Sequence, residues 1–205
     1  MSYLTLSGYF LLLFFSVLII NIPMLSAIDL AVVQWMFEHR NCILDAIAVS
    51  LSVLGGMPCV LFLTTVWCLA LLRLKNYASI IFVGLGLIGS ILLAWLIKYL
   101  VAKPRPPDVY HLVDSYGASF PSAHSVYASA LACLIFYLTI NHPKHLWIGI
   151  TIAIWVIMMG ISRIYLGVHF PSDVLSGWSI SFIWIWGLYG LFCRYKLFVL
   201  MNNKF

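Results

Sequence analysis

Six long apolar stretches divide this chain of 205 residues. They lie near residues 3–23, 52–72, 78–98, 124–140, 147–166 and 174–194. At about 1.5 Å per residue, helices of this length approach or exceed the roughly 30 Å of a hydrocarbon layer. Lipid offers the backbone no water, so a spanning segment must be a helix or part of a closed barrel. No stretch alternates like a barrel strand. The sequence therefore predicts an all-α integral membrane protein built as a six-transmembrane-helix bundle.

Composition supports this class and excludes others. Hydrophobic residues make up 64% of the chain and charged residues only 8%, unlike a soluble domain. The length suits one bundle, so we expect residues 1–205 to form a single membrane-embedded domain with the lipid bilayer as its partner. The formal charge is +5, but the basic residues are scattered, and we expect neither nucleic-acid binding nor an obligate protein partner. Five cysteines show no metal-binding spacing, which predicts neither a metal site nor a disulfide framework.

The segment after the first span is mixed in character. Residues 24–50 combine acidic and basic side chains with Leu, Val and aromatic residues, which predicts a short interfacial helix along the membrane surface. Gly55, Gly56 and Pro58 are expected to bend the second span near one end.

Basic residues suggest an orientation. Six spans put both termini on one side, and a cytoplasmic N-terminus gives six cytoplasmic and five outer Lys and Arg residues. The six cytoplasmic ones are Arg73, Lys75, Lys144, Arg194, Lys196 and Lys204. Three of the outer five belong to the polar groups described next, and without them the bias of six to two follows the positive-inside rule. We therefore expect those polar groups at the outer face.

Three polar groups interrupt the apolar sequence between residues 98 and 173. They are Lys98-x6-Arg105-Pro106, Pro121-Ser122-Ala123-His124 and Ser162-Arg163-x5-His169-x3-Asp173. Ionisable residues close to a membrane are expensive and usually functional. Three cations, two histidines and two hydroxyls suit an anion with a transferable centre, and phosphate is the obvious candidate.

The first two groups can bind and protonate. Lys98 and Arg105 can present an ammonium and a guanidinium to one phosphoryl group, although cations also commonly snorkel at the end of a span. Pro121 and Ser122 open the fourth span, where free amide groups attract anions. His124 is placed to protonate a leaving oxygen.

The third group can supply a nucleophile. His169 and Asp173 are four residues apart, with Pro171 marking a helix start, so their side chains can meet on one face. A carboxylate bonded to one imidazole nitrogen fixes the tautomer and leaves the other as a nucleophile. Arg163 adds another cation. Structural polar residues in a loop remain the alternative.

Together, the three groups and the six-span plan resemble the type 2 phosphatidic acid phosphatase superfamily of membrane lipid phosphatases. The resemblance implies that His169 forms a phosphohistidine, that Asp173 orients it, and that His124 is the general acid and base. It further implies a set of phosphate-binding residues, without metal or cofactor: Lys98, Arg105, Ser122, Ala123 and Arg163. The family usually has Gly in place of Ala123, but a helix start has negative φ, so Ala is expected to fit.

The implied activity is hydrolysis of a lipid phosphate or diphosphate at the outer (periplasmic) face of a bacterial cytoplasmic (inner) membrane. Undecaprenyl diphosphate, giving undecaprenyl phosphate, is the first choice of substrate; phosphatidylglycerophosphate and phosphatidate are close alternatives. A lipid phosphotransferase or a non-catalytic lipid transporter are alternatives of another class. Asp108, His111 and Asp114 in the outer loop could contact a headgroup, but solvated loop residues are the more expected reading.

Overall fold

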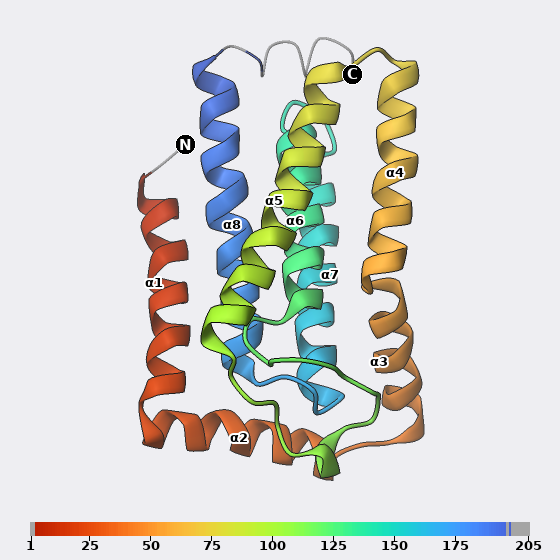
Figure 1. Cartoon of the computed structure of the whole chain (residues 1–205). Helices are drawn as coiled ribbons and strands as arrows, with labels where there is room; N and C mark the ends of the chain where they lie inside the picture. Colours follow the sequence, from red (N-terminus) through yellow and green to blue (C-terminus); the bar gives the residue numbers. More distant parts are fainter. Residues whose placement is uncertain (1–2, 196, 198–205) are drawn as a thin grey trace.

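The computed structural model describes residues 3–195 and 197, and every regular element among them is a helix (Figure 1). Lys196 and Lys204, two of the predicted cytoplasmic cations, lie outside those residues. In chain order the elements are α1 (Tyr3–Asn21), α2 (Pro23–Glu38), α3 (Cys42–Leu54), α4 (Met57–Arg73), α5 (Tyr77–Val101), the 3-10 turn η1 (Asp108–Tyr110), α6 (Ala123–Leu138), α7 (His145–Tyr165) and α8 (Pro171–Arg194).

The predicted membrane helices are present with modest changes in length. Among the described residues, α1, α5, α7 and α8 are each long and apolar enough to cross a membrane, and α3 with α4 forms a bent pair that can serve as a fifth span. The fourth expected span, 124–140, corresponds to α6, which is apolar but has only 16 residues, about 24 Å. The all-α membrane fold is thus confirmed, with one helix shorter than a full span.

The region between the first and second spans differs from the prediction. A separate helix does follow the first span: α2 lies across one end of the bundle (Figure 1), but it ends at Glu38 rather than near residue 50. The next helix, α3, begins at Cys42 and continues toward α4. Asp45 made this stretch look polar, yet its carboxylate accepts a 2.7 Å hydrogen bond from the Tyr165 hydroxyl. Because the Asp45 carboxylate has this hydrogen-bond partner, α3 does not need to lie at the membrane surface.

The second span is bent where glycine allows it. α3 and α4 meet at 53° across Gly55 and Gly56, and Pro58 lies in the first turn of α4. Proline is tolerated there because the first amides of a helix have no partner within it. The predicted bend therefore exists, but it divides the span internally and does not lie near one end.

The core is built around α6, which packs against α5, α7 and α8. Small residues let these helices approach closely, as is usual for helix pairs within a membrane. A Cβ atom on Gly177 of α8 would lie 2.9 Å from the Ser122 carbonyl oxygen at the start of α6. At the other end, Tyr137 and Tyr189 stack with ring centroids 4.2 Å apart. The starts of α6 and α8 are thereby held side by side.

One end of the bundle carries α2, the loop of residues 102–122 and the turn between α7 and α8 (Figure 1). Hydrogen bonds hold this end together. The Leu112 amide donates to the Leu166 carbonyl at 3.0 Å, and Arg40 donates at 2.6 Å to the carbonyls of both Tyr110 and Tyr165. The long loop is therefore tied to the end of α7 and to the turn between α2 and α3, as expected for a loop that shapes a site.

Candidate active site

All three polar groups of the sequence lie at this end of the bundle. In the first group, Lys98 is in the last turn of α5 and Arg105 is in the loop that follows. The second group, Ser122, Ala123 and His124, starts α6. In the third group, Arg163 is in the last turn of α7, His169 lies in the turn after it, and Asp173 is in the first turn of α8. Arg163, His169 and Asp173 are at most 3% exposed. Buried ionisable groups need partners, and the contacts below supply them.

His169 and Asp173 meet as their spacing predicts. Nδ1 of His169 lies 3.4 Å from Oδ2 of Asp173. The same carboxylate oxygen accepts the Phe170 amide at 2.9 Å and the hydroxyl of Ser119. This carboxylate is an acceptor only, so it favours the tautomer with the proton on Nδ1. Nε2 then carries the lone pair, and it lies 3.3 Å from Nη1 of Arg105.

The surroundings of His169 keep the ring neutral. Burial lowers the pKa of His169 from its ordinary value to about 3, against the opposing influence of Asp173, and the charges of Arg163 and Arg105 lower it further. Near neutral pH the imidazole is therefore uncharged, with a free electron pair on the nitrogen that faces Arg105. This is the protonation state that a nucleophilic histidine requires.

Backbone carbonyls of the loop position two of the predicted phosphate-binding cations. Arg105 donates from Nε to Gly117, from Nη2 to Tyr116 and from Nη1 to Val168, at 2.8–2.9 Å. Lys98 Nζ donates to the carbonyls of Ala118 and Ser119 at 2.5 and 3.3 Å. Burial lowers the pKa of Arg105, and the negative charge of Asp173 partly restores it. The loop therefore holds two cations close to the His169 turn.

His124 and Arg163 share a partner that the sequence did not single out. Nε2 of His124 lies 3.1 Å from the Ser52 carbonyl, and Nη1 of Arg163 donates to the Ser52 hydroxyl at 2.5 Å. A carbonyl can only accept, so Nε2 of His124 carries a proton and Nδ1 is left for proton exchange. Arg163 Nε is buried with no hydrogen-bond partner in the described part of the chain, which leaves one donor available to an anion.

Ser122 and Ala123 occupy the helix start that was predicted. The Ser122 amide donates to the Asp173 carbonyl at 2.9 Å, and its hydroxyl oxygen accepts the Ser125 hydroxyl at 3.0 Å. Ser122 is the N-cap of α6 and Ala123 its first residue. Positive φ at non-glycine residues occurs, within the described chain, at Lys75 and Ala102. Ala123 therefore has an ordinary helical backbone, and its methyl group requires no strain.

Lys103 is a further cation at this site, and it is one of the two predicted outer cations that lie outside the three polar groups. Its ammonium lies 3.0 Å from Oδ1 of Asp173 and 3.3 Å from Oδ2 of Asp29 on α2. Ser119 was also missed, although its hydroxyl reaches Asp173 and lies 3.4 Å from His169 Nδ1. Neither residue belongs to the spacing of the three groups, and only the fold brings them to the carboxylate.

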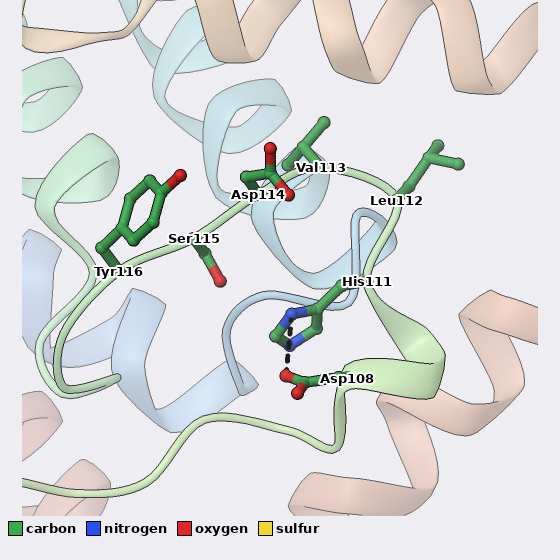
Figure 2. Close-up of a pocket in the computed structure, with 7 residues that line it drawn as sticks. All are labelled: Asp108, His111, Leu112, Val113, Asp114, Ser115 and Tyr116. Atoms are coloured by element: carbon green, nitrogen blue, oxygen red, sulfur yellow. Dashed lines mark ion pairs between the residues drawn. The ribbon is translucent and has the colours of Figure 1, made fainter.

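A cavity of about 580 Å³ is formed by the loop of residues 102–122 itself (Figure 2). Its lining residues are Asp108, His111, Leu112, Val113, Asp114, Ser115 and Tyr116. The Asp108 carboxylate and His111 face each other at 3.4 Å, and the other ring nitrogen of His111 lies 2.9 Å from the Pro106 carbonyl. The Asp108 side chain is otherwise fully exposed. Across the described residues, no three His, Cys, Asp or Glu side chains gather as metal ligands would.

Comparison with known protein families matches residues 79–195 to the PAP2 superfamily. Among characterised proteins, the chain is 38% identical over 97 residues to phosphatidylglycerophosphatase B of Bacillus subtilis, covering 45% of this chain and 47% of that protein. It is 27% identical over 151 residues to undecaprenyl-diphosphatase BcrC of the same species, covering 71% and 74%. The matched region thus spans about half of the first relative and three quarters of the second.

Solved structures share the same architecture. A crystal structure of a transmembrane PAP2-type phosphatidylglycerolphosphate phosphatase from Bacillus subtilis superposes with a TM-score of 0.84 at 24% identity, covering 92% of this chain and 96% of that one. Aquifex aeolicus LpxE gives a TM-score of 0.66 at 24% identity, covering 78% and 94%. At these identities the likeness establishes the fold.

Proposed function

Because this chain belongs to the PAP2 superfamily, we propose that it is a membrane lipid phosphatase that works through a phosphohistidine on His169. The observation that carries the proposal is the environment of that ring. Asp173 holds Nδ1, and the unprotonated Nε2 faces the guanidinium of Arg105. A neutral imidazole with its lone pair directed toward a cation is poised to attack an electrophile that the cation binds.

In the first step, Nε2 of His169 attacks phosphorus while the bond from phosphorus to the lipid oxygen breaks. His124, in its protonated form, gives a proton from Nδ1 to the departing oxygen. The Nδ1 proton of His169 stays on the ring, where Asp173 stabilises the positive charge that the imidazole acquires. The Ser52 carbonyl keeps the His124 ring oriented during this transfer.

In the second step, water attacks the phosphohistidine and the bond between phosphorus and Nε2 breaks. The neutral His124 left by the first step accepts a proton from that water, which restores the starting protonation states. Phosphoryl transfer depends mainly on positioning and charge neutralisation. Lys98, Arg105 and Arg163 supply the cationic surroundings, and the amides at the start of α6, near Ser122 and Ala123, offer additional donors.

For the substrate, we favour undecaprenyl diphosphate, with phosphate released at the outer face of a bacterial inner membrane. The relative BcrC supports a polyprenyl diphosphate, and the bias of basic residues supports the orientation. Phosphatidylglycerophosphate is the second candidate, supported by the 38% identity to phosphatidylglycerophosphatase B. In both cases we treat residues 1–205 as one phosphatase unit.

The test is phosphate release by the purified protein in detergent from a panel of lipid phosphates and diphosphates. Wild type is expected to release phosphate from undecaprenyl diphosphate without any added acceptor lipid, and to form an acid-labile phosphoenzyme. Vanadate should inhibit it, because vanadate mimics the trigonal bipyramidal transition state. His169→Gln should lose both turnover and phosphoenzyme. His142→Gln, at the opposite end of the bundle, is the matched control and should retain both.

The outcomes separate the candidate functions. Phosphoenzyme that releases no phosphate in water but passes its phosphoryl group to an added lipid alcohol, forming a new lipid phosphate, would identify a phosphotransferase. Wild-type activity in cells carrying His169→Gln would identify a non-catalytic lipid transporter. Preference for phosphatidylglycerophosphate over the diphosphate would assign the second candidate substrate and leave the mechanism unchanged.

A further inference from the structure

Lys103 lies between two buried carboxylates that come from opposite ends of the sequence. Its ammonium donates to Asp173 Oδ1 at 3.0 Å, to Ser172 Oγ at 2.9 Å and to Asp29 Oδ2 at 3.3 Å. It also lies 4.1 Å from the ring centroid of Phe170, close enough for a cation–π contact. The Lys103 side chain is 15% exposed and the two carboxylates at most 2%. The three charges thus form one enclosed group.

Asp29 has no part in the phosphoryl transfer described above, yet all its contacts lead to the catalytic turn. It accepts the Ser172 amide at 2.9 Å and the Ser172 hydroxyl at 2.5 Å, in addition to Lys103. Removing a carboxylate from water is unfavourable, and its attraction to a partner only partly offsets this. A carboxylate in the middle of a surface helix could stay in water on the exposed face. A role at the site therefore explains the burial of Asp29 better.

The charges explain what a second carboxylate adds. If Lys103 paired with Asp173 alone, the ammonium would draw the carboxylate's negative charge away from His169. With Asp29 sharing the ammonium, the group of three keeps one net negative charge, and it lies beside the imidazole that becomes positive on phosphorylation. Hydrogen-bonded groups in a low-dielectric interior polarise one another strongly, so this sharing affects the reacting ring.

We propose that Lys103 and Asp29 are positioning residues for the phosphorylation of His169, Lys103 by fixing the Asp173 carboxylate and Asp29 by sharing the Lys103 charge. The inference rests on the proposed phosphohistidine function and adds two residues to it. Neither residue touches the phosphoryl group. Both act through Asp173, whose other oxygen faces His169 Nδ1.

The experiment measures phosphoenzyme formation by rapid quench separately from KM, using purified protein and undecaprenyl diphosphate. In Asp29→Asn the full Lys103 charge falls on Asp173, so phosphoenzyme formation should slow by about tenfold, a typical effect of an outer hydrogen-bond partner, with KM nearly unchanged. Lys103→Arg keeps the charge and should retain most of the rate. Lys103→Met should be the slowest, because it leaves two buried carboxylates without their cation.

Two further variants guard against simple loss of folding. The double variant Asp29→Asn with Lys103→Met removes one charge of each sign, and should fold better and phosphorylate faster than Lys103→Met alone. Asp45→Asn is the matched control: it also removes a carboxylate that ties an N-terminal helix to the bundle, through Tyr165, but it does not contact Asp173. Its phosphorylation rate per folded molecule should equal that of wild type.

The positioning role and the proposed phosphatase function can fail independently. Wild-type phosphorylation rates in Asp29→Asn and Lys103→Met, or an equal slowing in Asp45→Asn, would overturn the positioning role. Absence of any phosphoenzyme in the wild-type protein would instead overturn the proposed function, which is a separate result.

Discussion

At the scale of single residues, His169 gives the site an acid-sensitive feature. Its folded pKa is about 3, whereas the exposed ring in the unfolded chain titrates near 6.5. Between these values the unfolded state binds the extra proton, so acid favours unfolding. Stability from the neutral ring is fully present above pH 6.5 and is lost as the pH falls toward 3.

We therefore expect wild type to lose more thermal stability than His169→Gln between pH 6.5 and 4.5. Tryptophan fluorescence on heating in detergent measures this. His142→Gln, which removes an exposed histidine, should keep the wild-type slope. Identical slopes in wild type and His169→Gln would contradict the neutral buried ring.

Arg163 is expected to be intolerant of lysine. Its guanidinium uses Nη1 for the Ser52 hydroxyl and keeps Nε without a partner among the described residues, which leaves Nε for the phosphoryl group in the proposed mechanism. Lysine offers a point charge without that geometry. Arg163→Lys should lower kcat/KM for phosphate release by at least about tenfold, or roughly 1.4 kcal/mol of transition-state stabilisation. Arg73→Lys, exposed at the far end of the bundle, should have no effect, and an unchanged kcat/KM in Arg163→Lys would contradict this dual use.

The site residues that could be predicted from the sequence are those whose partners lie only a few positions away along the chain. His169 and Asp173 are four residues apart across the start of α8, and His124 follows Pro121 by three residues at the start of α6, so spacing alone placed them. Lys103 could not be found this way, because its meaning depends on Asp29, 74 residues earlier in the chain. Ser52 could not be predicted either, because a single serine in an apolar span belongs to no recognisable motif.

At the scale of helices and turns, Gly167 is the most constrained position near the site. Its φ is +75°, and an added Cβ would lie 1.9 Å from the Tyr110 carbonyl oxygen. Gly117 has a similar φ of +71° but open space around it. Substituting Gly117 therefore tests the free-energy cost of a left-handed backbone alone. Substituting Gly167 adds the steric clash of the new Cβ atom with Tyr110.

We expect Gly117→Ala to destabilise the protein by roughly 1–2 kcal/mol, the cost of left-handed backbone for an L-residue. Gly167→Ala should cost clearly more and should also lower phosphate release, because His169 is two residues further along. Thermal unfolding and turnover of both variants check this. Equal stability losses would mean that the turn moves away from Tyr110 freely.

Helix boundaries show the limit of apolar pattern reading. The stretches at 78–98 and 174–194 appear as α5 and α8 with ends shifted by a few residues. The helices of the second span begin earlier than predicted, since Asp45, one of the acidic residues of the mixed segment 24–50, lies on α3 and accepts a hydrogen bond from the Tyr165 hydroxyl on α7. A contact across 120 residues decides where α3 lies, and hydropathy contains no such information.

At the scale of the whole molecule, the site and the turn between α6 and α7 lie at opposite ends of the bundle (Figure 1). The proposed orientation therefore predicts opposite accessibility for Asp114 and Lys144, both exposed. In a variant lacking the five native cysteines, Asp114→Cys should react with a membrane-impermeant maleimide on intact cells. Lys144→Cys should react only after permeabilisation. The reverse pattern would place the site on the cytoplasmic side.

The joining of α6 to α8 through the Ser122 amide and the Asp173 carbonyl has a consequence for biogenesis. As the chain leaves the ribosome, Lys98, Arg105 and His124 enter the membrane well before α8. In the proposed mechanism, His169 is oriented as the nucleophile only once α8 has inserted and met the start of α6. We therefore expect a nascent chain stalled before Pro171 to be an incomplete bundle without the proposed hydrolytic activity, so the appearance of that activity would report that insertion is complete.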